Sequence, residues 1–436
     1  MPAPGRYRVL ALVCVLSMIT YLDRVCFAAA APFLVTELSL ASVADLKWAF
    51  TAFAISYAVF EIPGGWLGDR LGPRSTLIRI VLWWSVCTAL TGLVGIRLGG
   101  LVFGGLTTLI VIRFLFGAGE AGAYPNITRA IHNWFPAKDW AFAQGCVWMS
   151  GRVMGGLTPL VWAVLVSGTS ASTPLVTWRG AFLLFGAIGV VWCVVFARSF
   201  RNHPPSLEVK REASHAVPWR AMSRSRTLWA VCLMYGLVTY GWYFNITYLP
   251  AYMNVRFDLK PDSELGAVYK GGPLWVGAAG CVLGGVLAGR LTRWFGKRRG
   301  RAVLGVGALS LTAACWSVAA SATSVEAFFL TVSAAAFCID LTLGATWATC
   351  QDIGGRNAAV TAATMNMVGT FGAATAGWVT GTIIERALAA RPVVDEVSKR
   401  AAILDGFHDC FVSFAAVYVV AAACWLVIDP DRELAG

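Results

Sequence analysis

The octet Gly64-Gly65-Trp66-Leu67-Gly68-Asp69-Arg70-Leu71 recurs 220 residues later as Gly284-Gly285-Val286-Leu287-Ala288-Gly289-Arg290-Leu291. The chain has 436 residues, so the two copies lie about half its length apart. A long apolar stretch precedes each copy and a basic turn follows it. Repetition on this scale in a membrane protein is typical of transporters whose two similar halves enclose the substrate. The repeat therefore predicts a carrier that moves a small solute across a membrane.

The composition is that of a membrane protein. Hydrophobic residues make up 58% of the chain and charged residues 13%, and the mean hydropathy is +0.67. The charges are clustered, which leaves apolar runs of roughly the 20 residues that span a bilayer. The net charge of +12 does not indicate nucleic-acid binding, because most basic residues fall in the short segments between the apolar runs.

The cysteines and histidines indicate neither a disulfide framework nor a metal site. Most of the 12 cysteines stand singly inside apolar runs, as small buried side chains do, and no Cys-x-x-Cys occurs. The 4 histidines fall outside the middle of the apolar runs. We therefore expect no metal ion and no organic cofactor.

The apolar runs predict an all-α membrane protein with twelve transmembrane helices, because helices of this length satisfy their backbone groups internally. The expected spans are 9–35, 46–67, 75–96, 101–124, 143–167, 180–198, 227–251, 267–289, 302–321, 326–350, 358–384 and 407–428. A polar connector with Pro204-Pro205 and seven basic residues separates the sixth span from the seventh. The predicted organisation is a six-helix half at 1–198, a cytoplasmic connector at 199–226 and a second, pseudo-symmetric six-helix half at 227–436.

The distribution of basic residues sets the expected orientation. With both termini inside, the inner segments hold about 21 Lys and Arg, and the outer loops hold about ten. Cytoplasmic loops usually carry such an excess of positive charge. The first apolar run has no small-residue cleavage site, so we expect it to be retained as a helix. These patterns predict a multi-pass protein of the cell inner (plasma) membrane with both termini in the cytoplasm.

Longer motifs resemble a known family. Gly65-x-Leu67-Gly68-Asp69-Arg70-Leu71-Gly72-Pro73-Arg74 resembles the signature loop between the second and third spans of the major facilitator superfamily. Other stretches resemble its anion:cation symporter family, namely Tyr21-Leu22-Asp23-Arg24, the run from Arg113 to Gly122, Trp134-Phe135-Pro136, Asp352-Ile353-Gly354-Gly355 and Met365-Asn366. The resemblance covers nearly the whole chain and implies the major facilitator fold. That family includes proton-coupled carriers of hexuronates, aldonates, aldarates and aromatic acids, and vesicular carriers of glutamate and sialate.

The signature loop is a candidate conformational latch formed by Gly65, Asp69, Arg70, Gly72 and Arg74. Its glycines allow close helix packing and a sharp turn. Asp69 stands at a cytoplasmic helix end, where it can pair with basic groups in only one of two packings and so bias the protein toward one state. The second copy has glycine in place of this aspartate, so a charge latch there is weaker or absent.

Ionisable residues inside the expected spans are candidates for proton transfer, because each costs on the order of 3 kcal/mol to insert. Arg113 and Glu120 are seven residues apart, about two helical turns, and share nearly the same face. They form either a structural ion pair or part of a proton site whose affinity a nearby arginine controls. In similar sugar-acid symporters the matching glutamate and the aspartate of the first span carry protons. The resemblance therefore implies proton coupling by Glu120 and Asp23.

Three arginines inside the spans, Arg24, Arg113 and Arg152, are candidate anion ligands. A guanidinium group binds a carboxylate through two parallel hydrogen bonds. For Arg152 the alternative is a structural arginine bonded to backbone carbonyls. An additional cation in the fifth span also favours a second acidic group on the substrate.

Polar and aromatic residues are expected to frame the rest of the cavity. Tyr21 and Tyr57 are the aromatic candidates, and Asn366 matches a sugar-hydroxyl ligand in the family pattern. Thr370 stands where relatives often have a second asparagine. Glu61 is assigned to the inner latch. Asp340 has three open roles: a second proton site, the partner of an arginine, or a polar contact between helices.

Together these features predict alternating-access import of an organic anion, such as a hexuronate, aldonate or aldarate, with protons. We expect a monomer. The alternatives are a carrier of another mode (a uniporter or a drug:proton antiporter) and a membrane sensor that binds an anion without transporting it. Lipophilic cations would favour an acidic cavity with few arginines, and the connector and short tail leave no room for a signalling domain. No nucleophile–base pairing, phosphate loop or metal spacing indicates an enzyme.

Overall fold

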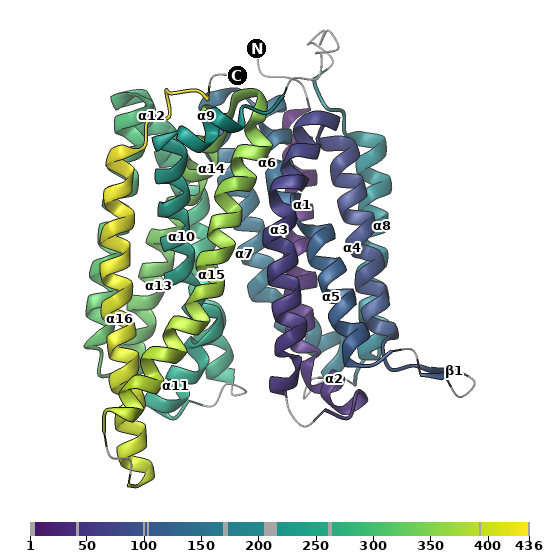
Figure 1. Cartoon of the computed structure of the whole chain (residues 1–436), viewed down its shortest axis with the longest axis vertical. Coiled ribbons are helices and arrows are strands. Elements are labelled where there is room, and N and C mark those ends of the chain that lie inside the picture. Colours follow the sequence, from purple (N-terminus) through teal and green to yellow (C-terminus); the bar gives the residue numbers. More distant parts are fainter. Residues whose placement is uncertain are drawn as a thin grey trace.

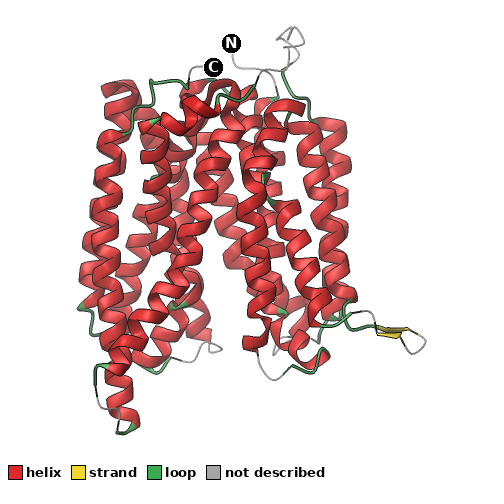
Figure 2. Cartoon of the chain, in the orientation of Figure 1, coloured by secondary structure: helices red, strands yellow, loops and turns green. Residues whose placement is uncertain are grey.

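Helices dominate the computed structural model of this chain (Figure 2). The structure describes residues 5–40, 43–98, 101–102, 104–168, 173–204, 216–259, 264–391 and 394–434. Within that part of the chain, strand pairing is limited to an antiparallel hairpin of β1 (Arg97–Leu98) and β2 (Leu101–Val102), which projects from one end of the molecule.

The long helices form two bundles that stand side by side (Figure 1). The helices of the first half are α1 (Arg6–Ala29), α2 (Ala31–Glu37), α3 (Lys47–Leu71), α4 (Pro73–Leu93), α5 (Leu106–Glu120), α6 (Ala123–Trp134), α7 (Trp140–Trp162) and α8 (Trp178–Ser199). Those of the second half are α9 (Trp219–Arg224), α10 (Arg226–Thr247), α11 (Leu249–Phe257), α12 (Glu264–Ala320), α13 (Val325–Leu341), α14 (Leu343–Gly354), α15 (Ala358–Ala389) and α16 (Glu396–Val427). Helix α1 begins and α16 ends at the same end of the molecule, which we call the terminal end.

The described helices make the twelve crossings that the sequence predicts. Eight stretches are long and apolar enough by themselves to span a membrane. Two of these, Gly271–Ala320 and Val325–Ala389, each contain two crossings, and α3 and α10 provide the others. The prediction of an all-α membrane fold with twelve helices is therefore confirmed. Of the predicted connector at 199–226, residues 205–215 lie outside the described part of the chain.

Several helices are longer than the predicted spans. The fourth crossing, expected to end near 124, continues as α6 to residue 134 after a break at Gly122, whose φ is +82°. The tenth crossing breaks at the equivalent place, between α13 and α14. The predicted spans are shorter than these helices because an apolar run marks only the part of a helix that crosses the lipid. The polar last turns of the helix pack against protein.

The first glycine of each repeated octet packs on a broken helix of its own half. A Cβ on Gly64 would lie 2.8 Å from the carbonyl oxygen of Ala121, at the break between α5 and α6. Its counterpart Gly284 packs on the backbone of Leu341, at the break between α13 and α14. Only a residue without a side chain allows the backbones to approach this closely.

The second glycine of each octet faces the opposite half. A Cβ on Gly65 of α3 would lie 2.7 Å from the carbonyl oxygen of Ala359 in α15. A Cβ on Gly285 of α12 would lie 2.6 Å from the carbonyl oxygen of Ala141 in α7. The sequence repeat thus produces equivalent packing in the two halves, which confirms their predicted pseudo-symmetry.

Candidate functional site

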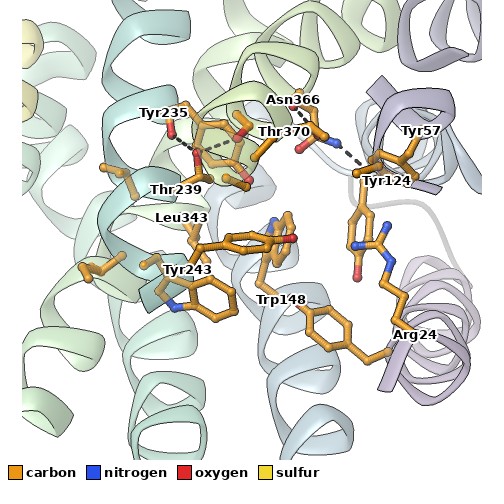
Figure 3. A pocket seen from close by; sticks show the side chains of 18 of the residues that line it. Arg24, Tyr57, Tyr124, Trp148, Tyr235, Thr239, Tyr243, Leu343, Asn366 and Thr370 are labelled. Atoms are coloured by element: carbon orange, nitrogen blue, oxygen red, sulfur yellow. Dashed lines mark hydrogen bonds between the residues drawn. The ribbon is translucent and has the colours of Figure 1, made fainter. Parts of the chain in front are cut away.

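A cavity lies between the two halves and receives side chains from both (Figure 3). Its empty volume is about 910 Å³, including the open solvent at its mouth. Aromatic side chains supply much of its wall: Tyr21, Phe53, Tyr57, Tyr124, Trp148, Tyr235, Trp242 and Tyr243. The cationic residues of the lining are Arg24 and Arg152, and its polar residues include Asn366 and Thr370.

Five of the predicted site residues line this cavity, and they are Tyr21, Arg24, Tyr57, Arg152 and Asn366. The predicted proton carriers Asp23 and Glu120 and the predicted ligand Arg113 are not among the described lining residues. Asp23 instead precedes the lining residue Arg24 in the sequence, and Glu120 bonds Arg24.

Arg24 of α1 is held by Glu120, the last residue of α5. The Nε of Arg24 donates to Oε1 of Glu120 over 2.7 Å, and Glu120 is 1% exposed. The Nη2 of Arg24 and the Oε2 of Glu120 make no hydrogen bond to any described residue. The guanidinium carbon lies 4.6 Å from the centre of the Tyr57 ring. The Arg24 side chain is still 26% exposed and lines the cavity, so it can also contact an anion there.

Of the two roles left open for Arg113 and Glu120, the direct ion pair is not found among the described contacts, because Glu120 bonds Arg24 instead. The guanidinium carbon of Arg113 lies 4.1 Å from the centre of the Phe27 ring and 4.5 Å from that of Phe116. Its Nε has no hydrogen-bond partner among the described residues. Residues seven apart share a helix face but are separated by roughly 10 Å along the axis. An arginine from the neighbouring helix therefore reaches Glu120 more easily.

Asp23 is a buried carboxylate without a described hydrogen-bond partner. It is 3% exposed, and neither of its side-chain oxygens accepts a hydrogen bond from a described residue. Buried carboxylates are normally paired or hydrogen-bonded, because leaving an ionised one unpaired is costly. Asp23 interacts with the charges of Glu120 and Arg113 and with Trp84, so it belongs to the same buried polar cluster as Glu120.

Arg152 of α7 forms an ion pair across the two halves with Asp340 of α13. Its Nε and Nη2 donate to the two carboxylate oxygens of Asp340 over 2.9 and 3.0 Å. Its Nη1 donates to the Tyr21 hydroxyl over 2.8 Å. Gly151 and Gly155 pack directly on the Tyr21 ring, where a Cβ would not fit. Of the three roles considered for Asp340, the structure shows that of partner to an arginine.

Asn366 of α15 connects the cavity to Glu61 of α3. Its Nδ2 donates to Oε1 of Glu61 over 2.5 Å and lies 3.4 Å from the hydroxyl oxygen of Tyr57. Glu61 is fully buried. The Thr370 hydroxyl donates to the backbone oxygen of Asn366 over 3.0 Å. The bond between Asn366 and Glu61 holds the two halves together deep in the molecule.

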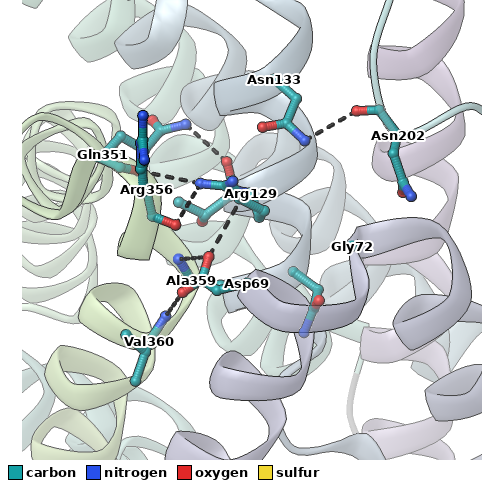
Figure 4. Close-up of polar contacts among 12 residues, drawn as sticks. Asp69, Gly72, Arg129, Asn133, Asn202, Gln351, Arg356, Ala359 and Val360 are labelled. Atoms are coloured by element: carbon teal, nitrogen blue, oxygen red, sulfur yellow. Dashed lines mark hydrogen bonds and ion pairs between the residues drawn. The ribbon is translucent and has the colours of Figure 1, made fainter. Parts of the chain in front are cut away.

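At the terminal end, Asp69 joins the halves (Figure 4). Its two carboxylate oxygens accept hydrogen bonds from the backbone N–H groups of Ala359 (3.1 Å) and Val360 (2.8 Å), at the start of α15. Asp69 therefore caps a helix of the other half, where an acidic group is favoured by the helix dipole. The Nε of Arg129 lies 3.7 Å from Asp69 Oδ1.

Arg129 and Gln351 complete this contact, although the sequence did not single them out. Arg129 donates to the backbone oxygens of Gly355 (3.2 Å) and Arg356 (2.8 Å), and Gln351 donates to that of Thr128 (2.9 Å). Both side chains come from polar helix ends, where nothing in the pattern distinguishes them from solvent-facing residues. Only the juxtaposition of the halves reveals their partners.

The other predicted latch residues act within the first half. Gly72 has a φ of +84° and turns the chain between α3 and α4. The backbone N–H of Arg74 donates to Oδ1 of Asn202 over 2.9 Å, and its Nη2 donates to the Ala197 oxygen over 2.5 Å. Arg70 is exposed, with its guanidinium 5.1 Å from the Trp66 ring centre. In this packing Asp69 and Gly65 touch the second half, whereas these three residues shape the loop.

Comparisons with known proteins agree with the fold. The profile of the Major Facilitator Superfamily matches residues 13–377. The chain is 33% identical, over 383 residues and 83% of both chains, to a Cupriavidus necator protein named "Probable sulfoacetate transporter SauU". It is 27% identical over 352 residues, and 78% of both chains, to the hexuronate transporter of Bacillus subtilis. The crystal structure of the E. coli fucose:proton symporter FucP superposes with a TM-score of 0.68 at 13% identity, covering 96% of this chain and 99% of that one.

Proposed function

Because this chain belongs to the Major Facilitator Superfamily, as its motifs predicted, we propose that it imports a small organic anion with protons by alternating access. The relatives named above for sulfoacetate and hexuronate transport support an acidic substrate. Sugar acids such as hexuronates, aldonates and aldarates are the first substrates to examine, together with sulfoacetate.

The observation that carries this proposal is the position of Arg24 in the cavity wall and its bond to Glu120. Its guanidinium lines the cavity and bonds Glu120 through Nε, and the side chain remains 26% exposed. A carboxylate or sulfonate in the cavity can bind the exposed part of the guanidinium group. The aromatic wall excludes water around the contact and so strengthens it.

Protons enter the mechanism through Glu120 and Asp23. A proton on Glu120 removes its negative charge and weakens its hold on Arg24, which leaves the guanidinium available to the substrate. Asp23, which precedes Arg24 in α1 and is 3% exposed, is the second proposed proton carrier. The anion and the proton therefore favour each other's binding, which is the requirement for symport.

The closed end of the molecule fits import from outside. Asp69 and Arg129 join the halves at the terminal end. We propose that this end faces the cytoplasm of a cell with the protein in its inner (plasma) membrane, as the positive charge of the inner segments favours. The cavity would then be reached from the outside, and the latch would open after substrate and proton have bound. The working unit that we propose is the monomer.

The test is uptake into proteoliposomes that contain the purified protein. Labelled glucuronate, galactonate, glucarate, sulfoacetate, phthalate, lactate and glutamate are offered with and without an inward proton gradient. We expect accumulation of one class of acid that collapses when the gradient is dissipated. Equilibration without any response to the gradient would contradict symport, and the absence of transport of every acid would contradict the proposed function.

A further inference from the structure

A buried ion pair stands between the cavity and the second half. Arg152 lines the cavity and makes two hydrogen bonds to Asp340, which is not among the described lining residues. The two side chains are 5% and 1% exposed, so bulk water is excluded from both charges. The guanidinium carbon also lies 3.8 Å from the centre of the Trp242 ring, which fixes its orientation. Arg152 thus presents a preorganised cation whose present counterion is a residue of the protein itself.

The arrangement repeats that of Arg24 and Glu120. Each cationic residue of the described lining is held by one nearly fully buried carboxylate from another helix. Tyr21 lies between them, because its hydroxyl accepts a hydrogen bond from Arg152 and it is close enough to both arginines to interact with their charges. The cavity therefore offers two guanidinium groups to one ligand.

We propose that Arg152 is a specificity-determining residue that binds the second acidic group of a dianionic substrate, which replaces Asp340 at the guanidinium. This inference rests on the proposed transport of organic anions and adds the substrate class. The ligand carries two carboxylates, or one carboxylate and one sulfonate. One acidic group binds Arg24 and the other binds Arg152. A monoanion has no group for Arg152 and leaves its ion pair with Asp340 intact.

The replacement has a consequence for Asp340. A buried carboxylate that loses its guanidinium partner is destabilised. Asp340 therefore competes with the ligand, and the second acidic group of a dianion must bind Arg152 more strongly than this carboxylate does.

The test is calorimetric binding with two pairs of probes that differ by one acidic group: glucarate and gluconate, and sulfoacetate and acetate. We expect the dianion of at least one pair to bind about tenfold or more tightly than its monoanion. Asp340→Asn, which removes the competing carboxylate, should keep the preference.

The double variant Arg152→Gln/Asp340→Asn removes both charges and leaves no unpaired ion in the core. It should bring the affinity ratio of that pair close to one. Arg179→Gln is the matched control, because Arg179 pairs with Glu37 outside the described cavity lining over 2.9 Å. This control should leave the ratio unchanged.

Equal affinities within both pairs, or an unchanged ratio in the double variant, overturn the inference. If an acid of the proteoliposome panel is transported but no dianion is preferred, only this inference fails. If nothing binds and nothing is transported, the proposed function fails with it.

Discussion

The charged residues of the cavity wall find their counterions on other helices. Glu120 meets Arg24 from α1, and Asp340 meets Arg152 across the two halves. A carboxylate that holds a cavity-facing guanidinium controls whether that guanidinium is free. The chemistry of each site therefore depends on contacts between helices and not on spacing along one helix.

Replacing Glu120 by glutamine tests its proposed role as proton carrier. Gln keeps the shape of Glu and a hydrogen bond to Arg24 but cannot release a proton. At an inward gradient of one pH unit, one coupled proton sustains roughly tenfold accumulation of the anion. With Glu120→Gln, we expect the anion concentration inside the proteoliposomes to rise only to the concentration outside. The variant should still exchange labelled for unlabelled substrate.

The matched control is Glu37→Gln, which makes the same chemical change in the half-exposed pair with Arg179. It should accumulate substrate like the unaltered protein. If Glu120→Gln still accumulates the anion like the unaltered protein, a residue other than Glu120 carries the coupled proton.

Between helices, the important contact is the capping of α15 by Asp69 of α3. The capped N–H groups belong to one half and the carboxylate to the other, so the bonds break when the halves separate at the terminal end. Helix caps are worth about 1 kcal/mol, enough to bias an equilibrium about fivefold without locking it. This strength suits the proposed latch, which must open in every transport cycle.

Asp69→Ala should shift the protein toward the state that is open at the terminal end, by about fivefold. The shift can be measured as a change in the distance distribution between spin labels attached at Arg201→Cys and Arg432→Cys, which report on the separation of the halves. Asp139→Ala is the control, because Asp139 pairs with Arg6 inside the first half over 2.8 Å. An unchanged distribution in Asp69→Ala would mean that other contacts hold the halves together.

Bulky side chains at the glycines of the repeated octet offer a second way to separate the halves, measured with the same spin labels. A side chain on Gly65 or Gly285 would collide with the backbone of the opposite half, and overpacking of this kind typically costs about 1–3 kcal/mol. We expect Gly65→Val and Gly285→Val each to populate the longer spin-label distance. Gly307→Val should not, since no atom outside its own helix turn lies within 4 Å of a Cβ there. Wild-type distances in both octet variants would refute the closing contact.

For the molecule as a whole, the orientation that we propose from the distribution of charge can be tested with a membrane-impermeant maleimide on intact cells. Nine native cysteines are buried, while Cys14, Cys146 and Cys315 are partly buried, so the unaltered protein provides the background. The exposed Val397 lies at the start of α16, opposite the terminal end. We expect Val397→Cys to react from outside and Arg432→Cys to react only after permeabilisation. The reverse pattern would invert the proposed topology and make the closed side the outer one.

The amino-acid sequence by itself determined the fold class, the twelve helices and the pseudo-symmetry. Apolar runs of bilayer length leave the backbone no alternative to helices, and a repeated octet requires equivalent packing in both halves. It also identified Tyr21, Arg24, Tyr57 and Arg152, which line the cavity, because polar groups in an apolar span stand out. Asn366, which lines it too, came from the resemblance to the family.

Only the tertiary structure decided which charged residues pair with each other. Glu120 bonds Arg24 and not Arg113, and Asp340 bonds Arg152 from 188 positions away. The latch residue Arg129 and the cavity aromatics Trp148 and Tyr235 have no distinguishing sequence pattern, because the same residue types serve equally at polar helix ends and in packing. Local sequence fixes which groups a helix carries. Which charges meet depends on how the helices pack, because the strength of an ion pair is set by distance and burial in space.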